Sequence, residues 1–478
     1  MSTMTASTSV APESGPLPQG GFVAGSVLAI ALTGAAVAWL PVLAWLPLGA
    51  LVGVLLLASA RFRVAFVVLG GLAVLQSSQD LSPLKIGYLV GVVVAVGTAS
   101  FNLRTLESTE SYRLMRPLLR VSLLFLGLVV LSAVVARLHG NPASAWLRDA
   151  APFLLFAFVP ILAMDICSSV SRRYLLVMFV LVGVLATASF AVEWLDRRHL
   201  ADLGLNRIAL PSLFLAAALF SYEVSEALQG KGNRAAWTAL AALSFSVLLI
   251  TGTRGVFVLL AAPLAITFTG GGSFARRSLR VVVLGGVAVL LVLVFMQVLT
   301  RLTGADMGAA TERLASVQRL MRDRESDQSY AQREDQTRVA WRAFLSEPLV
   351  GTGPGYAFQW GAADREVQTN FNIDTAVSFP AKFGLAGIAI FIALAVGFSV
   401  FLRNLGRRAG PTVPRAALLG FAAVTLLSLP LGSPFEDKGF SFGLVLLVAL
   451  GLAELRVNHR RPPSAAGTET GLHPEARR

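Results

Sequence analysis

An arginine stands between two apolar runs in the stretch TGTRGVF, residues 251–257. A guanidinium stays charged at physiological pH and offers several N–H donors, so it binds phosphate or carboxylate oxygens well. Such a group is costly among apolar residues unless it reaches a polar boundary or a bound anion. Arg254 is therefore either an interfacial anchor at a helix end or a functional cation, and the surrounding elements must decide where it lies.

The composition identifies the surroundings of this arginine as mostly lipid. Of 478 residues, 55% are hydrophobic and only 14% are charged, and the mean hydropathy is +0.69. Such values are typical of a polytopic membrane protein, and the length of its apolar runs predicts an all-α fold. A single cysteine, Cys167, excludes an intramolecular disulfide and a cysteine-rich metal site.

Apolar runs long enough to cross a hydrocarbon core of about 30 Å recur along the chain. They predict about 12 to 14 transmembrane helices, near residues 22–40, 41–60, 64–79, 84–100, 120–137, 150–166, 174–194, 207–225, 236–251, 255–270, 280–299, 379–402, 416–432 and 440–455. The predicted organisation is a disordered N-terminal lead at 1–20, helices 1 to 11 within 21–299, a large extracytoplasmic loop at 300–378, helices 12 to 14 within 379–455, and a disordered cytoplasmic tail at 456–478.

Clusters of arginine and lysine alternate with these runs and predict how the chain crosses the membrane. Short loops that are rich in basic residues stay on the cytoplasmic side. Such loops would carry Arg61 and Arg63, the stretches 104–120, 172–173, 231–234, 276–280 and 403–415, and the tail RVNHRR. Topology therefore explains the net charge of +13 better than a nucleic-acid surface does, since there is no soluble basic domain to form one.

The same clusters predict the position of Arg254. The segment 235–268 would be about 51 Å long as one helix, far more than a bilayer core, with Arg254 near its middle. Basic clusters on both sides belong to the cytoplasm, so an even number of crossings must lie between them. Two short helices therefore meet at 251–255, where Gly252 and Gly255 permit a tight reversal. This reversal brings Arg254 to the outer face.

A polar stretch of about 80 residues separates the span that ends near 299 from the one that begins near 379. It is too long for a simple connection in a compact bundle, and such loops usually carry function. Within it, ERLASVQRLMRDR and REDQTRVAWRAFLSEP each predict a helix, the second ended by Pro348. The following LVGTGPGYAF predicts a glycine-rich reversal, because it lacks the preceding strand and following helix of a nucleotide-binding loop.

Three motifs, in this order, resemble those of the integral-membrane O-antigen ligases and O-antigen polymerases. The first is TGTRG, which ends one span and begins the next; the second is TRVAWRAFLSEPLVGTGPGY in the long loop; the third is DTAVSFPAKFGLAGIAIF, where the loop returns to the membrane. They lie within about residues 200–400, whereas the first six spans share only their apolar character with the family. The resemblance implies a multi-pass protein of the cytoplasmic membrane that assembles polysaccharide.

The resemblance also implies a chemistry. This family transfers a glycan from a polyprenyl diphosphate carrier to an acceptor hydroxyl on the outer face of the membrane, without nucleotide sugar, metal or other cofactor. Cations must then hold the diphosphate and stabilise it as it leaves. The motifs assign this binding and catalytic role to Arg254 and Arg338, with Arg207 as a third candidate for binding, and they put Gly353 and Gly355 beside the donor.

The acceptor hydroxyl needs a group that orients or deprotonates it, and here the sequence departs from the family. Many members carry a histidine where the long loop returns to the membrane, but the histidines of this chain lie elsewhere, at His139, His199, His459 and His473. The nearest counterpart is Asp374, which is either the catalytic base or a cap of the following helix. His199, on the predicted outer face but outside the motif, is the alternative.

Three classes of function fit a polytopic protein of this kind. The motifs favour a lipid-linked glycan polymerase or ligase, and the missing loop histidine favours the polymerase. A transporter or lipid-linked glycan flippase should show internal repeats and ionisable residues at mid-membrane, and the sequence indicates neither. A scaffold would not need the motifs. The predicted partners are the polyprenyl-diphosphate-linked donor, a glycan or other hydroxyl acceptor, and the lipid bilayer, with no nucleic acid.

Overall fold

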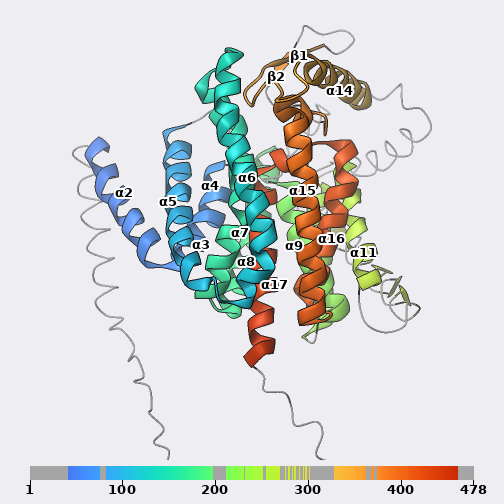
Figure 1. Cartoon of the computed structure of the whole chain (residues 1–478). Helices are drawn as coiled ribbons and strands as arrows, with labels where there is room; N and C mark the ends of the chain where they lie inside the picture. The colour runs from blue at the N-terminus through green and yellow to red at the C-terminus, as the bar shows by residue number, and fades with distance from the viewer. Residues whose placement is uncertain are drawn as a thin grey trace, which may run out of the picture. The chain divides into compact units, whose positions relative to one another are not determined.

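The computed structural model describes residues 41–75, 82–197, 212–230, 232–250, 254–269, 328–361, 368–370, 373 and 375–460, together with single positions between 275 and 301. The chain divides into two compact units, one ending at Ala58 and the other beginning at Ser59. The described element of the first unit is the apolar helix α2, Pro41–Ala58. All other elements belong to the second unit (Figure 1).

Helices make up almost all of the described part of the second unit, and most of them cover the apolar run that predicted them. Their ends fall at polar caps, prolines or glycines, which end such runs. They are α3 (Ala60–Ala65), η1 (Phe66–Gly70), α4 (Gly71–Leu75), α5 (Pro83–Leu106), α6 (Glu110–Leu138), α7 (Ala143–Ser169), α8 (Arg172–Arg197), α9 (Leu213–Gln229), α10 (Arg234–Ile250), η3 (Arg254–Leu260), α11 (Ala261–Thr269), α14 (Gln328–Ser346), α15 (Ser378–Ala409), α16 (Val413–Ser428), η4 (Leu429–Leu431), η5 (Pro434–Glu436) and α17 (Lys438–Arg460). The predicted all-α polytopic fold is confirmed.

Five of the described helices are long and apolar enough to cross a membrane, namely α5, α6, α7, α15 and α17. Shorter apolar helices cover Phe257–Thr267 and Val413–Ser428. The predicted span near 22–40 lies outside the described residues, and only single positions of the one near 280–299 are described. The predicted total number of spans therefore stays a prediction.

Helices α7 and α17 form the centre of the bundle. They pack against each other, and 89% of the apolar stretch of each is buried, compared with 33% for α6 and 28% for α15. Around them, α6 packs on α7 and α15, and α9 packs on α10, α16 and α17. Glycine allows α17 and α9 to approach closely, since a Cβ on Gly443 of α17 would lie 2.6 Å from the Cβ of Ala218 on α9. Outward apolar side chains on α6 and α15 suit contact with lipid.

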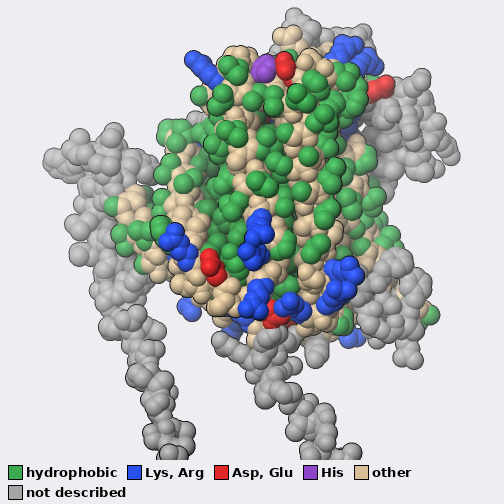
Figure 2. Space-filling view, viewed as in Figure 1, with side chains coloured by type: hydrophobic (Ala, Val, Ile, Leu, Met, Phe, Trp, Pro, Cys, Tyr) green, Lys and Arg blue, Asp and Glu red, His purple; other side chains and the backbone are tan. Residues whose placement is uncertain are grey.

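Basic residues gather at one end of this bundle, where α6 and α8 begin and where α7, α15 and α17 finish. Ion pairs join these helix ends, Arg408 to Glu110 and Arg172 to Glu454. Figure 2 shows Lys and Arg side chains concentrated at this lower end, while hydrophobic side chains cover the flank. The arrangement agrees with the predicted alternation of basic clusters. We call this the basic end, and the opposite end, which carries α14, the α14 end.

One arginine predicted for a short loop lies inside the bundle instead. Arg63 belongs to helix α3 and its side chain is only 4% exposed. Its Nε donates to Oδ2 of Asp165 at 2.8 Å and its Nη2 to Oδ1 at 3.0 Å, and Asn102 also donates to Oδ1. A buried charge needs such a partner, because it is very costly when unpaired away from water. The pattern could not show this pair, since Asp165 lies 102 residues further along the chain.

A small layer covers the start of α15 at the α14 end (Figure 1). It consists of α14 and an antiparallel pair of strands, β1 (Phe358–Trp360) and β2 (Gln368–Asn370). Its apolar core contains Ala340, Ala343, Phe344, Phe358, Trp360, Ile373 and Ala381. Helix α14 confirms the second helix predicted for the long loop and ends at Ser346, two residues before Pro348. The first helix predicted there lies outside the described residues.

Candidate functional site

The second and third motifs meet along the start of α15. The hydroxyl of Thr337 donates to Oγ1 of Thr375 at 2.9 Å. Further along, the N–H of Thr352 donates to the carbonyl of Ala381 at 2.9 Å, and the N–H of Gly353 to that of Lys382 at 3.1 Å. Two segments that the sequence separates therefore form one continuous contact at the α14 end.

The glycine-rich reversal is a tightly packed wedge between α6, α7 and α15. Gly353 and Gly355 have left-handed backbones, with φ of 78° and 82°. A Cβ on Gly353 would lie 2.8 Å from the backbone nitrogen of Ala136, and one on Gly355 would lie 2.6 Å from that of Trp146. Only glycine fits such positions without displacing its neighbours. Packing thus accounts for both glycines, and their predicted place beside the donor stays a prediction.

The wedge also determines how α15 begins. Gly384 interrupts the helix with a φ of 60°, and a Cβ there would lie 2.4 Å from the carbonyl carbon of Leu349. From the opposite side, the side-chain amide of Asn141 donates to the carbonyl of Thr352 at 3.1 Å. These contacts hold the start of α15, on which Lys382 stands, in a fixed place.

Three charged side chains from distant parts of the chain lie buried beside this wedge, and we call them the Lys382 cluster. Lys382 Nζ lies 2.7 Å from Oδ1 of Asp149 and 3.0 Å from Oε1 of Glu436, and the three side chains are 0%, 1% and 7% exposed, respectively. The N–H of Gly355 donates to Oδ2 of Asp149, and the hydroxyl of Ser378 donates to Oε1 of Glu436 at 2.6 Å. Two carboxylates share one ammonium, so the cluster carries an excess negative charge or an extra proton.

Phenylalanine rings surround the lower side of the cluster. These rings are Phe125, Phe153, Phe156, Phe379, Phe383, Phe391, Phe435 and Phe440. Lys382 Nζ lies 5.9 Å from the centre of the Phe153 ring, and the Phe435 ring lies 4.7 Å from that of Phe391. Apolar rings exclude water, which strengthens the attraction between the paired charges. The same exclusion favours the neutral, protonated form of a carboxyl that has no cation as its partner.

Two adjacent carboxyls at this end hold their protons more tightly than usual. Burial raises the pKa of Glu436 above its ordinary value; Lys382 lowers it, but the nearby Asp149 carboxylate raises it further. Burial also raises the pKa of Asp437 to about 6, although the Ser212 hydroxyl donates to its Oδ1 at 2.5 Å and acts in the opposite direction. The α14 end therefore contains carboxyls that exchange protons closer to neutral pH than ordinary acidic side chains do.

The structure describes some of the predicted site residues and not others. Arg338 lies on α14 with a side chain that is 57% exposed, 3.7 Å from Glu334 and 3.9 Å from Asp335 of the same helix. Exposed pairs of this length are weak, so they do not prevent the guanidinium from binding an anion. Arg254 is the first residue of η3, which packs against α9 and α16, and its side chain is not among those described. Outside the described residues lie Arg207, His199 and Asp374.

The contact between the two motifs joins the sequence neighbours of two predicted site residues. Thr337, which directly precedes Arg338, makes its hydrogen bond with Thr375, which directly follows Asp374. The chain segments that carry the two predicted residues are therefore adjacent in the fold, although 36 positions separate them in the sequence.

A histidine reaches the long loop from another part of the chain. His139 follows α6, its Nδ1 lies 2.9 Å from the carbonyl oxygen of Val135, and its Nε2 lies 3.5 Å from Oε1 of Glu347. The sequence has no histidine within the loop, but the fold brings this one against it. Among the described residues, no three His, Cys, Asp or Glu side chains are grouped closely enough to hold a metal ion.

Sequence reasoning assigned no role to the members of the Lys382 cluster. Each stands near the start of an apolar helix, in AWLRDAAPF, SFPAKFGL and SPFEDKGF. A charged residue in such a place is a functional signal in a membrane protein, and this signal was available. What the sequence did not contain was any sign that Asp149, Lys382 and Glu436 meet.

Glu223 corrects the expectation that no ionisable residue lies in the middle of an apolar span. It stands well inside α9 and is only 4% exposed. The Ser244 hydroxyl of α10 donates to its Oε1 at 3.1 Å. The apolar run predicted at 207–225 includes this glutamate, so the residue was visible, and its burial against α10 is what the structure adds.

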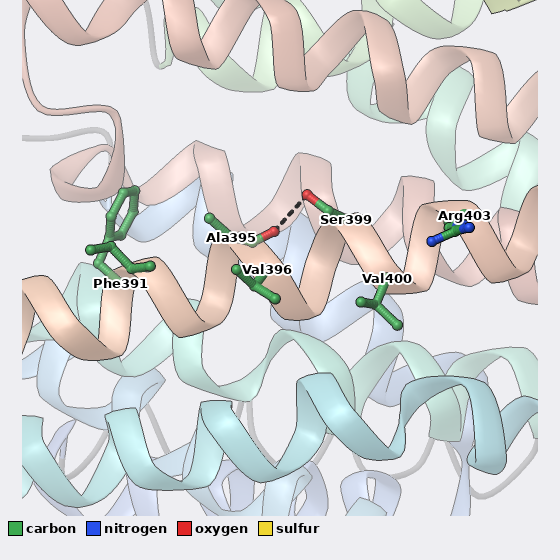
Figure 3. Close-up of a pocket in the computed structure, with 7 residues that line it drawn as sticks. Phe391, Ala395, Val396, Ser399, Val400 and Arg403 are labelled. Carbon is green, nitrogen blue, oxygen red and sulfur yellow. Dashed lines mark hydrogen bonds between the residues drawn. The ribbon is translucent and has the colours of Figure 1, made fainter.

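A shallow groove of about 390 Å³ follows the outward face of α15 (Figure 3). Its lining consists of Phe391, Ile392, Ala395, Val396, Ser399, Val400 and Arg403. The Ser399 hydroxyl donates to the Ala395 carbonyl of its own helix, so the groove is apolar apart from the guanidinium of Arg403 near the basic end. At the other end Phe391 contacts Phe435, and the groove therefore leads from the basic end to the rings below the Lys382 cluster.

These features define a class of protein: a polytopic α-helical membrane protein whose long loop packs over a buried charged cluster at one end of the bundle. Residues 239–392 match the family model described as Wzy_C, O-Antigen ligase, and this stretch, about a third of the chain, contains all three motifs. Over this stretch the chain is similar to the O-antigen ligase domain, which supports its assignment to the O-antigen ligase family. No curated protein matches the sequence. The domain implies an enzyme that transfers lipid-linked glycan in a membrane.

Proposed function

We propose that the chain transfers a glycan from a polyprenyl diphosphate carrier to a hydroxyl group of a second glycan, on the outer face of the cytoplasmic membrane. The observation that carries this proposal is the contact between two motifs of the O-antigen ligase domain beside the Lys382 cluster. The reaction needs cations for the diphosphate, a proton acceptor, and an apolar surface for the carrier. The α14 end has candidates for all three.

The α14 end corresponds to the outer face in this proposal. Basic loops stay in the cytoplasm, and the basic end joins the helix ends that carry the arginine clusters. The opposite end, with α14 and the Lys382 cluster, then faces the leaflet from which the carrier presents its glycan.

Arg254 and Arg338 are the proposed ligands of the diphosphate, with Arg207 as a third. Diphosphate carries several negative oxygens, and a guanidinium can donate two parallel hydrogen bonds to such a group. The developing charge on the departing diphosphate is best stabilised by fixed cations in a site that excludes water. The exposure of Arg338 on α14 is compatible with this role.

The groove on α15 is the proposed seat of the carrier's isoprenoid chain. From Phe391 to Arg403 the groove is about 18 Å long at 1.5 Å per helical residue, so it accommodates part of a long apolar chain. A chain that lies along it would bring the diphosphate to the α14 end, near the rings below the Lys382 cluster. The groove is open along its length, as entry from the bilayer requires.

Asp374 is the carboxylate that the motif indicates for orienting or deprotonating the attacking hydroxyl, and the acceptor is proposed to be another lipid-linked repeat unit, which makes the enzyme a polymerase. The turn that follows Asp374 is held by Thr375, whose Oγ1 accepts from Thr337 and from the N–H of Val377. A base must lie within hydrogen-bond reach of its proton donor, and a fixed turn provides such a constraint.

Replacement of Arg254 tests the proposal. We expect Arg254→Ala to insert normally and to abolish transfer, with Arg254→Lys restoring little because it lacks the fork of donors. The loss of one such contact costs about 1.5 to 3 kcal/mol, or more where charge develops in the transition state. The measurement is the release of polyprenyl diphosphate from native lipid-linked glycan by purified protein in nanodiscs, with Arg137→Ala as a matched control. Wild-type release by Arg254→Ala would reduce this residue to an interfacial anchor.

A flippase or transporter is the second candidate, because of Glu223. A buried carboxyl inside an apolar helix is typical of ion or substrate pathways. Movement of lipid-linked glycan between the leaflets of vesicles that contain the purified protein, lost in Glu223→Gln, would favour this function. Transfer without such movement would exclude it.

A further inference from the structure

We propose that Glu436 is a catalytic carboxylate, whose Oε2 accepts the hydrogen bond of the attacking hydroxyl and takes its proton. This inference rests on the proposed function and names a second carboxylate for it, from outside the three motifs. The matched stretch of the O-antigen ligase domain ends at residue 392, so Glu436 lies beyond it.

The hydrogen bonds of Glu436 hold one carboxylate oxygen and leave the other available. Oε1 accepts from the hydroxyl of Ser378 at 2.6 Å and from Nζ of Lys382 at 3.0 Å. Oε2 makes no hydrogen bond with any residue in the part of the chain that the structure describes. The side chain is 7% exposed, so it is mostly buried but not sealed. A carboxylate fixed through one oxygen, with the second open to a substrate hydroxyl, is suited to act as a positioned base.

The location of Glu436 relates it to the motif in which the base is expected. Ser378, its hydroxyl donor, is the first residue of α15 and lies four positions after Asp374. The short helix η5 and the start of α17 therefore bring Glu436 next to the segment where the long loop returns to the bundle. A substrate hydroxyl that reaches this segment would lie beside the carboxylate of Glu436.

The charges around Glu436 suit a base that works near neutral pH. Those that face it are Asp149 on α7 and Lys382 on α15, and Asp437 and Lys438 follow it in the chain. Burial raises the pKa of Glu436 above the ordinary value of glutamate, and Asp149 adds to this rise while Lys382 limits it. A base with a raised pKa holds a transferred proton more firmly than an exposed glutamate does.

The transfer step balances with the groups named. The O–H bond of the acceptor breaks and its proton moves to Oε2 of Glu436, while the acceptor oxygen forms a new bond to the anomeric carbon of the donor glycan. The bond between that carbon and the diphosphate oxygen breaks, and its electron pair leaves with the diphosphate. Water then removes the proton from Glu436 and restores the base.

The decisive variant is Glu436→Gln, which keeps the size of the side chain and the acceptor oxygen for Ser378 and Lys382 but cannot take a proton. We expect transfer to fall by roughly 10² to 10⁴-fold, as for the loss of a positioned base. Binding of polyprenyl diphosphate should stay within about twofold, because Glu436 contacts the acceptor and not the carrier. The matched control is Glu347→Gln, the same change on a half-exposed glutamate of the α14 end. Its transfer rate should equal that of the unmutated protein.

The experiment uses the full chain in nanodiscs, with native lipid-linked glycan from cells that lack the gene as donor and acceptor. The rate of polyprenyl diphosphate release is measured as a function of pH. In the unmutated protein it should decline as the pH falls through the pKa of Glu436, and the residual rate of Glu436→Gln should lack this decline. Ser378→Ala removes one donor from Oε1, so the pKa of Glu436 rises and the decline should begin at a higher pH.

Several outcomes overturn the inference. A wild-type rate in Glu436→Gln would remove Glu436 from the chemistry while leaving the proposed function intact. Glu436 is equally removed from the chemistry if Asp374→Asn abolishes the acidic decline and Glu436→Gln retains it. If the unmutated protein releases no polyprenyl diphosphate, the proposed function fails, and the role of Glu436 fails with it.

Discussion

The bundle contains a buried cluster of charges at each end, and the two clusters differ in how their charges are balanced. At the basic end, Arg63 meets Asp165 through two N–H groups, and Asn102 completes the bonding of the carboxylate. One cation faces one anion. At the α14 end, Lys382 faces the two carboxylates of Asp149 and Glu436.

The difference separates a structural pair from a reactive group. A buried pair with matched charges and filled hydrogen bonds has no reason to exchange protons, so it holds helices together and does little else. A buried centre with one carboxylate in excess must retain a proton or exchange it with a partner, and such perturbed groups are frequent at functional sites. The Arg63 pair should therefore be replaceable, and the Lys382 cluster should not.

The two ends also differ in what holds their charges. Arg63, Asp165 and Asn102 all stand on helices, α3, α7 and α5. In the Lys382 cluster, a backbone N–H of the glycine wedge, that of Gly355, donates to Asp149 at 2.8 Å. The position of the α14-end cluster thus depends on a loop, which a substrate can reach more easily than a helix inside a bundle.

The strongest test of the comparison replaces each cluster by neutral residues. Arg63→Met alone should cost about 3 to 5 kcal/mol, because Asp165 is left buried and unpaired. Adding Asp165→Leu should restore both stability and transfer. Lys382→Met should cost a similar amount, and adding Asp149→Asn and Glu436→Gln should restore stability but not transfer. Thermal unfolding in detergent and polyprenyl diphosphate release measure the two properties.

The comparison is contradicted if the variant with Arg63→Met and Asp165→Leu folds normally but loses transfer, since Arg63 would then have a role beyond packing. It is equally contradicted if the variant with Lys382→Met, Asp149→Asn and Glu436→Gln still transfers glycan, because the excess carboxylate would then be structural.

A second, smaller effect concerns the loops that hold each end. Gly355→Ala introduces a Cβ only 2.6 Å from the Trp146 nitrogen at a φ of 82°, whereas Gly410→Ala, at the basic end, meets open space at a φ of 73°. We expect Gly410→Ala to cost about 1 kcal/mol of backbone strain and Gly355→Ala more than about 2 kcal/mol. Only Gly355→Ala should lose transfer. Unfolding midpoints and transfer rates check this. Equal effects of the two substitutions would show that the wedge is not tightly packed.

A further expected effect is a pH dependence of stability from Asp437. Burial raises its pKa from 3.8 to about 6, so the folded protein binds this proton more tightly than the unfolded chain does. The contribution of Asp437 to stability therefore falls as the pH rises from about 4 to about 6, and then stays constant. Asp437→Asn keeps an acceptor for Ser212 and should remove this decline. Unfolding midpoints across this range test it, and identical pH profiles for both proteins would contradict it.

Local patterns predicted much of the fold. The apolar run at 120–137 became α6, which ends at Leu138, and REDQTRVAWRAFLSEP became most of α14, ended before Pro348. Such elements follow from hydrophobic run length, caps and proline, which act over a few residues. The motifs were likewise visible as local strings, and their order led to the O-antigen ligase domain that the family model matches.

The candidate site was less predictable, because its charged residues interact over long distances in the sequence. Lys382 is 233 positions from Asp149 and 54 from Glu436, and no local pattern connects them. For Gly355 the residue type was informative, but its reason, a close approach to Trp146, appears only in the packed structure.

By itself, then, the sequence determined that this is an all-α membrane protein with basic loops, a long polar loop and three motifs in order. Only the tertiary structure decided which charges share a buried centre. The physical reason is desolvation: a charged side chain at the start of an apolar helix is stable only with a partner, and that partner comes from whichever helix packs beside it. For Lys382, the packing of α7, α15 and η5 provides Asp149 and Glu436 as partners.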